Sequence, residues 1–151
     1  MPAAILLSLD SLIASMALVM LGMPPARAGK LCAAFMIFDG FATLTGLSVH
    51  TPFAPALLGA YLVLLLAVAT RSPLRTVFWA PALFSLDNLL AGIAAKPSPA
   101  SGIWLDSLTA AFTSGLLALI GIAIAAAIAS KMPRRWVYCA GLILLLAAIC
   151  I

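Results

Sequence analysis

Six apolar runs separated by short polar breaks dominate the sequence. The breaks contain proline, serine and basic residues, and proline ends a helix because it lacks the backbone N–H and disfavours helical geometry in the residue before it. Each run is close to the roughly 20 residues that an α-helix needs to cross the hydrocarbon core of a bilayer. The pattern predicts six membrane-spanning helices: Ala3–Met23, Leu31–Val49, Phe53–Thr70, Val77–Ala95, Ile103–Ala129 and Trp136–Ile151.

The composition is typical of a membrane protein. Hydrophobic residues make up 66% of the chain and charged residues only 8%, whereas a typical soluble domain has about 25% charged residues and just under half apolar ones. Six spans with short loops account for all 151 residues. We therefore expect an all-α membrane protein with a single transmembrane domain, residues 1–151, and no separate soluble domain.

Basic residues predict the orientation of these spans. Because each break is short, neighbouring spans run antiparallel, and an even number of spans puts both termini on one side. Only Lys96 falls on that side. The positive-inside rule places the other seven basic residues in the cytoplasm, which predicts a multi-pass protein of a bacterial-type inner membrane with both termini outside. These seven are Arg27, Lys30, Arg71, Arg75, Lys131, Arg134 and Arg135. Topology and headgroup contact thus explain the net charge of +4, and no nucleic-acid partner is expected.

The segment Ala26-Arg27-Ala28 resembles a signal-peptidase site because small residues follow an apolar stretch. That stretch has no basic residue before it, is long enough to span the membrane and contains Asp10 in its middle. We therefore expect the first span to be a retained helix.

The sequence contains an internal repeat at an offset of 77 residues. Ser8-Leu9-Asp10-x-Leu12-x-Ala14 matches Ser85-Leu86-Asp87-x-Leu89-x-Ala91, and weaker matches follow at Ala33-Ala34-Phe35 and at Tyr61. Each half holds three predicted spans, so the second half enters the membrane from the opposite side. This predicts an inverted 3+3 repeat, with repeat 1 at about residues 1–75 and repeat 2 at about residues 76–151, an architecture typical of secondary transporters. The alternative is a simple six-helix scaffold that arose by duplication.

All four acidic residues are aspartates, and Asp10 and Asp87 are equivalent in the repeat. An acid at the centre of a membrane helix costs about 2.5–3.5 kcal/mol on insertion scales, so intramembrane acids are functional candidates. Small residues on the same helix face lead us to expect both aspartates in the bundle interior, where two carboxylates repel unless a cation or proton lies between them. Neighbouring oxygen donors favour a hard divalent cation such as manganese or magnesium. The predicted site comprises Asp10, Asp87, Asp39, Asn88, Ser11 and Thr43.

Asp39 is unmatched, because the offset of 77 places Leu116 opposite it. Two interpretations stay open: Asp39 is a ligand, or it is a protonated or hydrogen-bonded group between helices. Asp106 is explained by its place near the start of a helix, where the helix dipole favours an acid. His50 lies in a short loop and is interpreted as solvated.

Other chemistry is not indicated. The three cysteines form no CxxC pair, and the sequence has no Ser-His-Asp or HExxH arrangement and no glycine pattern for nucleotides. We therefore expect no enzyme activity, no cofactor and no nucleotide-driven motor. Uphill transport would be driven by an ion gradient or the membrane potential.

Two segments resemble the manganese efflux pump (MntP) family of the lysine exporter superfamily. Ser8-Leu9-Asp10-Ser11-Leu12-Ile13-Ala14-Ser15 and Ser85-Leu86-Asp87-Asn88-Leu89-Leu90-Ala91-Gly92 are similar to the family's Asp-containing segments in its first and fourth helices. Phe38-x-x-Phe41, Gly121, the Arg134-Arg135 turn and Gly141-Leu142-Ile143-Leu144-Leu145 are similar in order and placement. The resemblance implies export of manganese or a related divalent cation, with Asp10 and Asp87 as cation-binding residues. Other hypotheses are an exporter of an amino acid or small organic cation, and a non-transporting membrane subunit. The sequence does not fix the oligomeric state.

Overall fold

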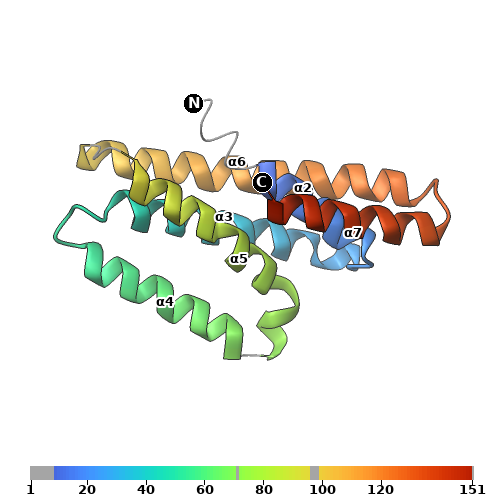
Figure 1. The fold of residues 1–151 in the computed structure, drawn as a ribbon, viewed down its shortest axis with the longest axis horizontal. Coiled ribbons are helices and arrows are strands. Elements are labelled where there is room, and N and C mark those ends of the chain that lie inside the picture. The colour runs from blue at the N-terminus through green and yellow to red at the C-terminus, as the bar shows by residue number, and fades with distance from the viewer. Residues whose placement is uncertain (1–8, 71, 96–98, 151) are drawn as a thin grey trace.

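The computed structural model describes residues 9–70, 72–95 and 99–150, and this part of the chain is all-helical, without strands (Figure 1). Its elements are α2 (Leu9–Met20), the 3₁₀ turn η1 (Pro25–Arg27), α3 (Ala28–Leu47), α4 (Ala54–Thr70), α5 (Ser72–Ala94), α6 (Ala100–Ala129) and α7 (Arg134–Cys150). The predicted all-α class is confirmed for these residues. Residues 3–8 of the first predicted span, Arg71, Lys96 and Ile151 lie outside the described residues.

Two of the described helices are long and apolar enough to cross a membrane: Ala28–Leu47, and Gly102–Ala129 within α6. α6 has 30 residues, which corresponds to about 45 Å at 1.5 Å per residue. Leu9–Met20 and Ala54–Thr70 are shorter apolar helices. α5 begins at Ser72, earlier than predicted, and continues through Pro81 without a break in the helix.

α3 lies at the centre of the bundle. It packs against both α5 and α6, and more lightly against α4 (Figure 1). α2 packs against α6 and α7, while α4 packs mainly against α5. Because α3 is covered on several sides, its aromatic residues Phe35 and Phe38 are fully buried and join two separate hydrophobic clusters.

Two glycines set the closest helix crossings. A Cβ atom at Gly46 of α3 would lie 2.5 Å from the Leu89 carbonyl oxygen and 2.9 Å from the Gly92 Cα on α5. A Cβ atom at Gly121 of α6 would collide with the Leu12 carbonyl oxygen on α2. Without side chains at these points the backbones approach closely, as is typical of helices in membranes. The crossings hold α5 against α3 and α2 against α6.

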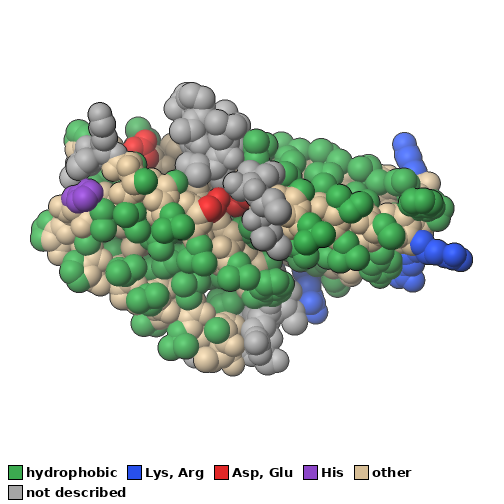
Figure 2. Space-filling view, in the orientation of Figure 1, with side chains coloured by type: hydrophobic (Ala, Val, Ile, Leu, Met, Phe, Trp, Pro, Cys, Tyr) green, Lys and Arg blue, Asp and Glu red, His purple; other side chains and the backbone are tan. Residues whose placement is uncertain are grey.

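Basic side chains gather towards one end of the molecule. Figure 2 shows most of them at that end, others on the lower side nearer the middle, and the histidine at the opposite end. The exposed basic residues that the structure describes are Arg27, Lys30, Lys131, Arg134 and Arg135. Large apolar side chains are exposed between the ends, with Phe112, Ile143 and Leu62 more than half exposed. The apolar surface and the two membrane-length helices indicate association with a membrane.

Candidate functional site

One serine hydroxyl connects two buried carboxyl groups on different helices. Ser11 of α2 donates a hydrogen bond to Asp39 Oδ2 of α3 at 2.9 Å, and its Oγ lies 3.4 Å from Asp10 Oδ1. Ser11 and Asp39 are completely buried and Asp10 is 4% exposed. The structure thus brings Asp10 together with Asp39, the aspartate that the repeat left unmatched.

α5 and α6 complete the surroundings of this pair. Asn88 of α5 is 3% exposed and Ser114 of α6 is completely buried. Ser114 interacts with the Asp39 carboxyl group, and the Asn88 amide lies near that group without a well-formed hydrogen bond. Ser85, Asn88 and Gly92 recur at helical spacing, so they share one face of α5. The crossing at Gly92 presses that face onto α3, which brings Asn88 to the carboxyl pair.

Asp10, Ser11, Asp39, Asn88 and Ser114 form one buried polar cluster. Three of its side-chain atoms have no hydrogen-bond partner. They are Asp10 Oδ2, Asp39 Oδ1 and Asn88 Nδ2. Buried polar groups are nearly always hydrogen-bonded, and leaving one without a partner costs about 1–3 kcal/mol. The three atoms without a partner come from three different helices: α2, α3 and α5. The described side chains thus leave part of the cluster's hydrogen-bonding capacity unused.

Asp87 differs from its repeat partner. Asp10 is buried as expected, whereas Asp87 is exposed, and its Oδ1 accepts a hydrogen bond from the backbone N–H of Asn88 at 2.7 Å. Asp87 still lies within electrostatic range of Asp10 and Asp39. In this structure it is therefore a peripheral charge and does not belong to the buried pair.

The unequal covering of α2 and α5 explains this difference. α7 packs along the small-residue flank of α2 that carries Asp10, with Gly141 next to the Ala17 carbonyl. α4 packs against another flank of α5, where a cleft of about 330 Å³ includes Trp79 and Leu86. The α5 flank that carries Asp87 thus lacks a helix equivalent to α7 among the described residues.

Thr43 does not turn its hydroxyl to the carboxyl pair. It donates a hydrogen bond to the Asp39 backbone carbonyl at 2.7 Å. This bond lies within α3 and does not involve the side chains of the cluster. Asp106 and His50 are exposed and take no part in the cluster. Of the six predicted site residues, Asp10, Ser11, Asp39 and Asn88 form the cluster, Asp87 borders it and Thr43 supports the helix.

Two neighbouring groups were not predicted from the sequence. Ser114 lies next to Asp39, and the Tyr61 hydroxyl of α4 lies 2.7 Å from Ser85 Oγ. Tyr61 and Ser85 are completely buried. Their hydrogen bond joins α4 to α5 about one turn from Asn88. The sequence signals for it were a tyrosine inside an otherwise apolar run and its match in the internal repeat.

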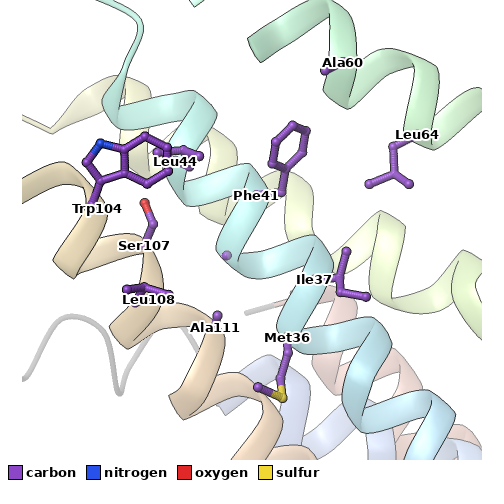
Figure 3. A pocket seen from close by; sticks show the side chains of 11 residues that line it. Met36, Ile37, Phe41, Leu44, Ala60, Leu64, Trp104, Ser107, Leu108 and Ala111 are labelled. Carbon is purple, nitrogen blue, oxygen red and sulfur yellow. The ribbon is translucent and has the colours of Figure 1, made fainter.

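A separate apolar cleft of about 460 Å³ opens between α3, α4 and α6 (Figure 3). Trp104 and Leu44 both line it, and Phe41 projects from α3 towards α4. Its one hydroxyl, that of Ser107, donates to the Ile103 carbonyl of the same helix. The cleft therefore offers no charged group to an ion.

Protein side chains alone do not form a closed metal cage here. Within the described ranges, no group of three or more His, Cys, Asp or Glu residues is arranged to hold a metal ion. The described free thiols are Cys32, partly buried, and Cys139, exposed. Comparisons of the chain with models of protein families, with curated proteins and with solved structures found no match. The cluster's own chemistry, two carboxyl groups with neutral oxygen donors, is the basis for assigning a function.

Proposed function

We propose that the protein is a secondary membrane transporter that exports a divalent metal cation, manganese before others, through the Asp10–Asp39 cluster. One observation supports this most: Ser11 joins two buried carboxyl groups whose remaining oxygens, Asp10 Oδ2 and Asp39 Oδ1, have no partner. Two carboxyl groups side by side in a protein interior repel each other when both are charged. A cation transporter needs them because a buried pair of carboxylates is stable only with a cation or protons.

The chemistry of the donors favours a hard divalent cation. One divalent ion balances the charge of two carboxylates, and the basic side chains that the structure describes are exposed, whereas the pair is buried. Asn88 can present its amide oxygen by rotating the amide, and Ser11 and Ser114 add hydroxyl oxygens. Oxygen donors without histidine or thiolate suit manganese and magnesium better than zinc or copper.

The pattern of helix contacts supports an inverted repeat and hence alternating access. Exchanging α2 with α5 and α3 with α6 turns the α3–α5 contact into the α6–α2 contact, and both are extensive. The two glycine crossings obey the same exchange, since Gly46 meets the Leu89 carbonyl and Gly121 meets the Leu12 carbonyl. In transporters of this architecture, one repeat rocks against the other around a central site.

The same crossings revise the alignment of the two halves. Leu12 and Leu89 are 77 residues apart, but Gly46 and Gly121 are 75 apart. For the second helix of each half, an offset of 75 therefore fits better than the predicted 77. It places Ser114, and not the 60% exposed Leu116, opposite Asp39. In this alignment the counterpart of Asp39 is Ser114, a neutral oxygen donor that lies against the Asp39 carboxyl group.

Manganese binding by the purified protein tests the proposal. We compare the wild type with Asp39→Asn and Asp10→Asn by calorimetry, and Asp106→Asn serves as the matched control because it makes the same change at an exposed position. Either cluster variant should bind at least about ten-fold more weakly, since an interaction with a charged group contributes about 1.5–3 kcal/mol. Asp106→Asn should bind like the wild type.

Comparison ligands separate this proposal from its alternatives. Magnesium and cadmium should compete with manganese, whereas lysine should not. Lysine binding without metal binding would indicate an exporter of an organic cation. If no cation binds and the Asp variants lose a co-purifying protein, the chain is a non-transporting subunit and the transport proposal is wrong. Manganese flux from proteoliposomes then determines the direction.

A further inference from the structure

A small pocket lies at the basic end of the molecule, away from the carboxylate cluster. It is about 200 Å³ in volume, and its walls come from the end of α2, the end of α6 and the first turns of α7. Arg134 and Tyr138 supply its polar side chains, and Met20 and Val137 are among its apolar walls. This volume is below the about 300–1,000 Å³ of typical small-molecule sites, so the pocket fits a single polar group.

The turn after α2 shapes this pocket. Gly22 has φ of 100°, a left-handed conformation that glycine adopts without strain. The Tyr138 hydroxyl lies 3.3 Å from the position that a Gly22 Cβ would occupy. The absence of a side chain at Gly22 thus lets the tyrosine hydroxyl sit over the turn. Tyr138 therefore places a hydrogen-bond donor in the same pocket as the Arg134 guanidinium.

The charge around the pocket is uniformly positive. Lys131 and Arg135 flank Arg134 in the sequence and are exposed, and Arg27 and Lys30, which follow the turn after α2, are exposed as well. The chain's four acids are all aspartates of the predicted spans, none of them in this segment. Among the described residues that line the pocket none is acidic, so the Arg134 guanidinium faces the pocket without a carboxylate beside it there. A phosphate group matches the guanidinium geometry because it accepts two parallel hydrogen bonds.

The apolar surroundings indicate that this phosphate belongs to a lipid. Trp136 is 66% exposed and Met132 is 46% exposed, both within a few residues of Arg134. Exposed tryptophan is typical of the membrane interface, the depth at which phospholipid phosphates lie. We propose that the pocket binds the headgroup phosphate of an anionic phospholipid, with Arg134 as its charged partner and the Tyr138 hydroxyl as a second donor. The acyl chains then follow the exposed apolar surface of α6 and α7.

Lipid retention by the purified full chain tests this assignment. The protein is equilibrated in mixed micelles containing phosphatidylglycerol or phosphatidylcholine, and the bound lipid is counted by native mass spectrometry. The wild type should retain phosphatidylglycerol in preference. Arg134→Gln should weaken retention by more than about ten-fold, because it removes a charge-assisted bidentate contact. Arg135→Gln is the matched control, and it should cost at most about five-fold, the effect of losing one surface charge.

A second variant tests the pocket without a change of charge, and three results would overturn the assignment. Tyr138→Phe should weaken retention while leaving all charges in place, so it tests the pocket even where Arg134→Gln fails to fold. Equal losses in Arg134→Gln and Arg135→Gln would show diffuse attraction and overturn the pocket assignment. Retention of phosphatidylcholine to the same extent would overturn the charge argument. Displacement of the lipid by millimolar inorganic phosphate would identify free phosphate as the ligand and overturn the lipid assignment.

Discussion

A methyl group added at Gly46 should destabilise the protein, although the same change at Gly59 should stabilise it. A Cβ atom at Gly46 would lie 2.5 Å from the Leu89 carbonyl oxygen, 2.9 Å from the Gly92 Cα and 3.0 Å from the Ile93 nitrogen. All three are backbone atoms of α5, so no side chain can rotate away. A Cβ atom at Gly59 of α4 would meet nothing within 4 Å.

The expected difference in stability follows from these contacts. A carbon and a carbonyl oxygen normally approach to about 3.3 Å, so Gly46→Ala must separate α3 from α5 by roughly 0.8 Å. Overpacking of this kind costs about 1–3 kcal/mol. Replacing glycine by alanine within a helix gains about 1 kcal/mol at either position. We therefore expect Gly46→Ala to be less stable than Gly59→Ala by about 1–3 kcal/mol.

Two measurements on the same purified variants check this reasoning. Unfolding in mixed micelles with increasing denaturing detergent gives the difference in the free energy of unfolding. Manganese calorimetry then reports on the cluster, because separating α3 from α5 also draws Asn88 away from Asp39. If Gly46→Ala matches Gly59→Ala in stability and matches the wild type in binding, the crossing does not hold the cluster together and the reasoning is refuted.

Three further variants test other contacts of the structure. Ser11→Ala should lower manganese affinity by about ten- to 150-fold through loss of its bond to a carboxylate. Ser15→Ala, which is equally buried and bonds only within α2, should leave binding unchanged by calorimetry. Tyr61→Phe should lower the free energy of unfolding by about 0.6–1.7 kcal/mol, the range for hydrogen bonds between membrane helices. An unchanged unfolding midpoint would show that the Tyr61–Ser85 bond is not stabilising. In a cysteine-free background, His50→Cys should react with an impermeant thiol reagent in intact cells, and Arg135→Cys only after permeabilisation; the reverse pattern would invert the topology.

The helices were predictable because the chain marks their ends. Pro24, Pro52 and Pro133 lie in breaks that the structure keeps as turns between helices. Pro81 was correctly left inside a helix, because apolar residues continue on both sides of it. Pro73 was misjudged as a break: it is the second residue of α5, a position near a helix start where the missing N–H costs nothing.

The central pair was harder to predict because its members are far apart in the sequence. Ser11 and Asp39 are 28 residues apart and meet only when α2 and α3 pack in one bundle. Repeat symmetry directed attention to Asp87 instead, which the packing of α4 and α7 leaves on an open flank. A gap of two residues between the halves would have aligned Gly46 with Gly121 and Asp39 with Ser114. Matching the halves without gaps could not find the offset of 75 proposed above.

The cluster is asymmetric in a way that bears on the proposed transport. Asp10, Ser11 and Asp39 all come from the first half of the chain, whereas Asn88 and Ser114 come from the second. Both buried carboxyl groups would therefore stay with one half during a rocking motion, and the other half would contribute neutral donors. A divalent ion would keep its charge balance when the halves separate, losing only its neutral ligands. Opening the site would therefore require less free energy than separating two charged ligands from each other. The motion itself would not break the strong attraction between the ion and the carboxylates.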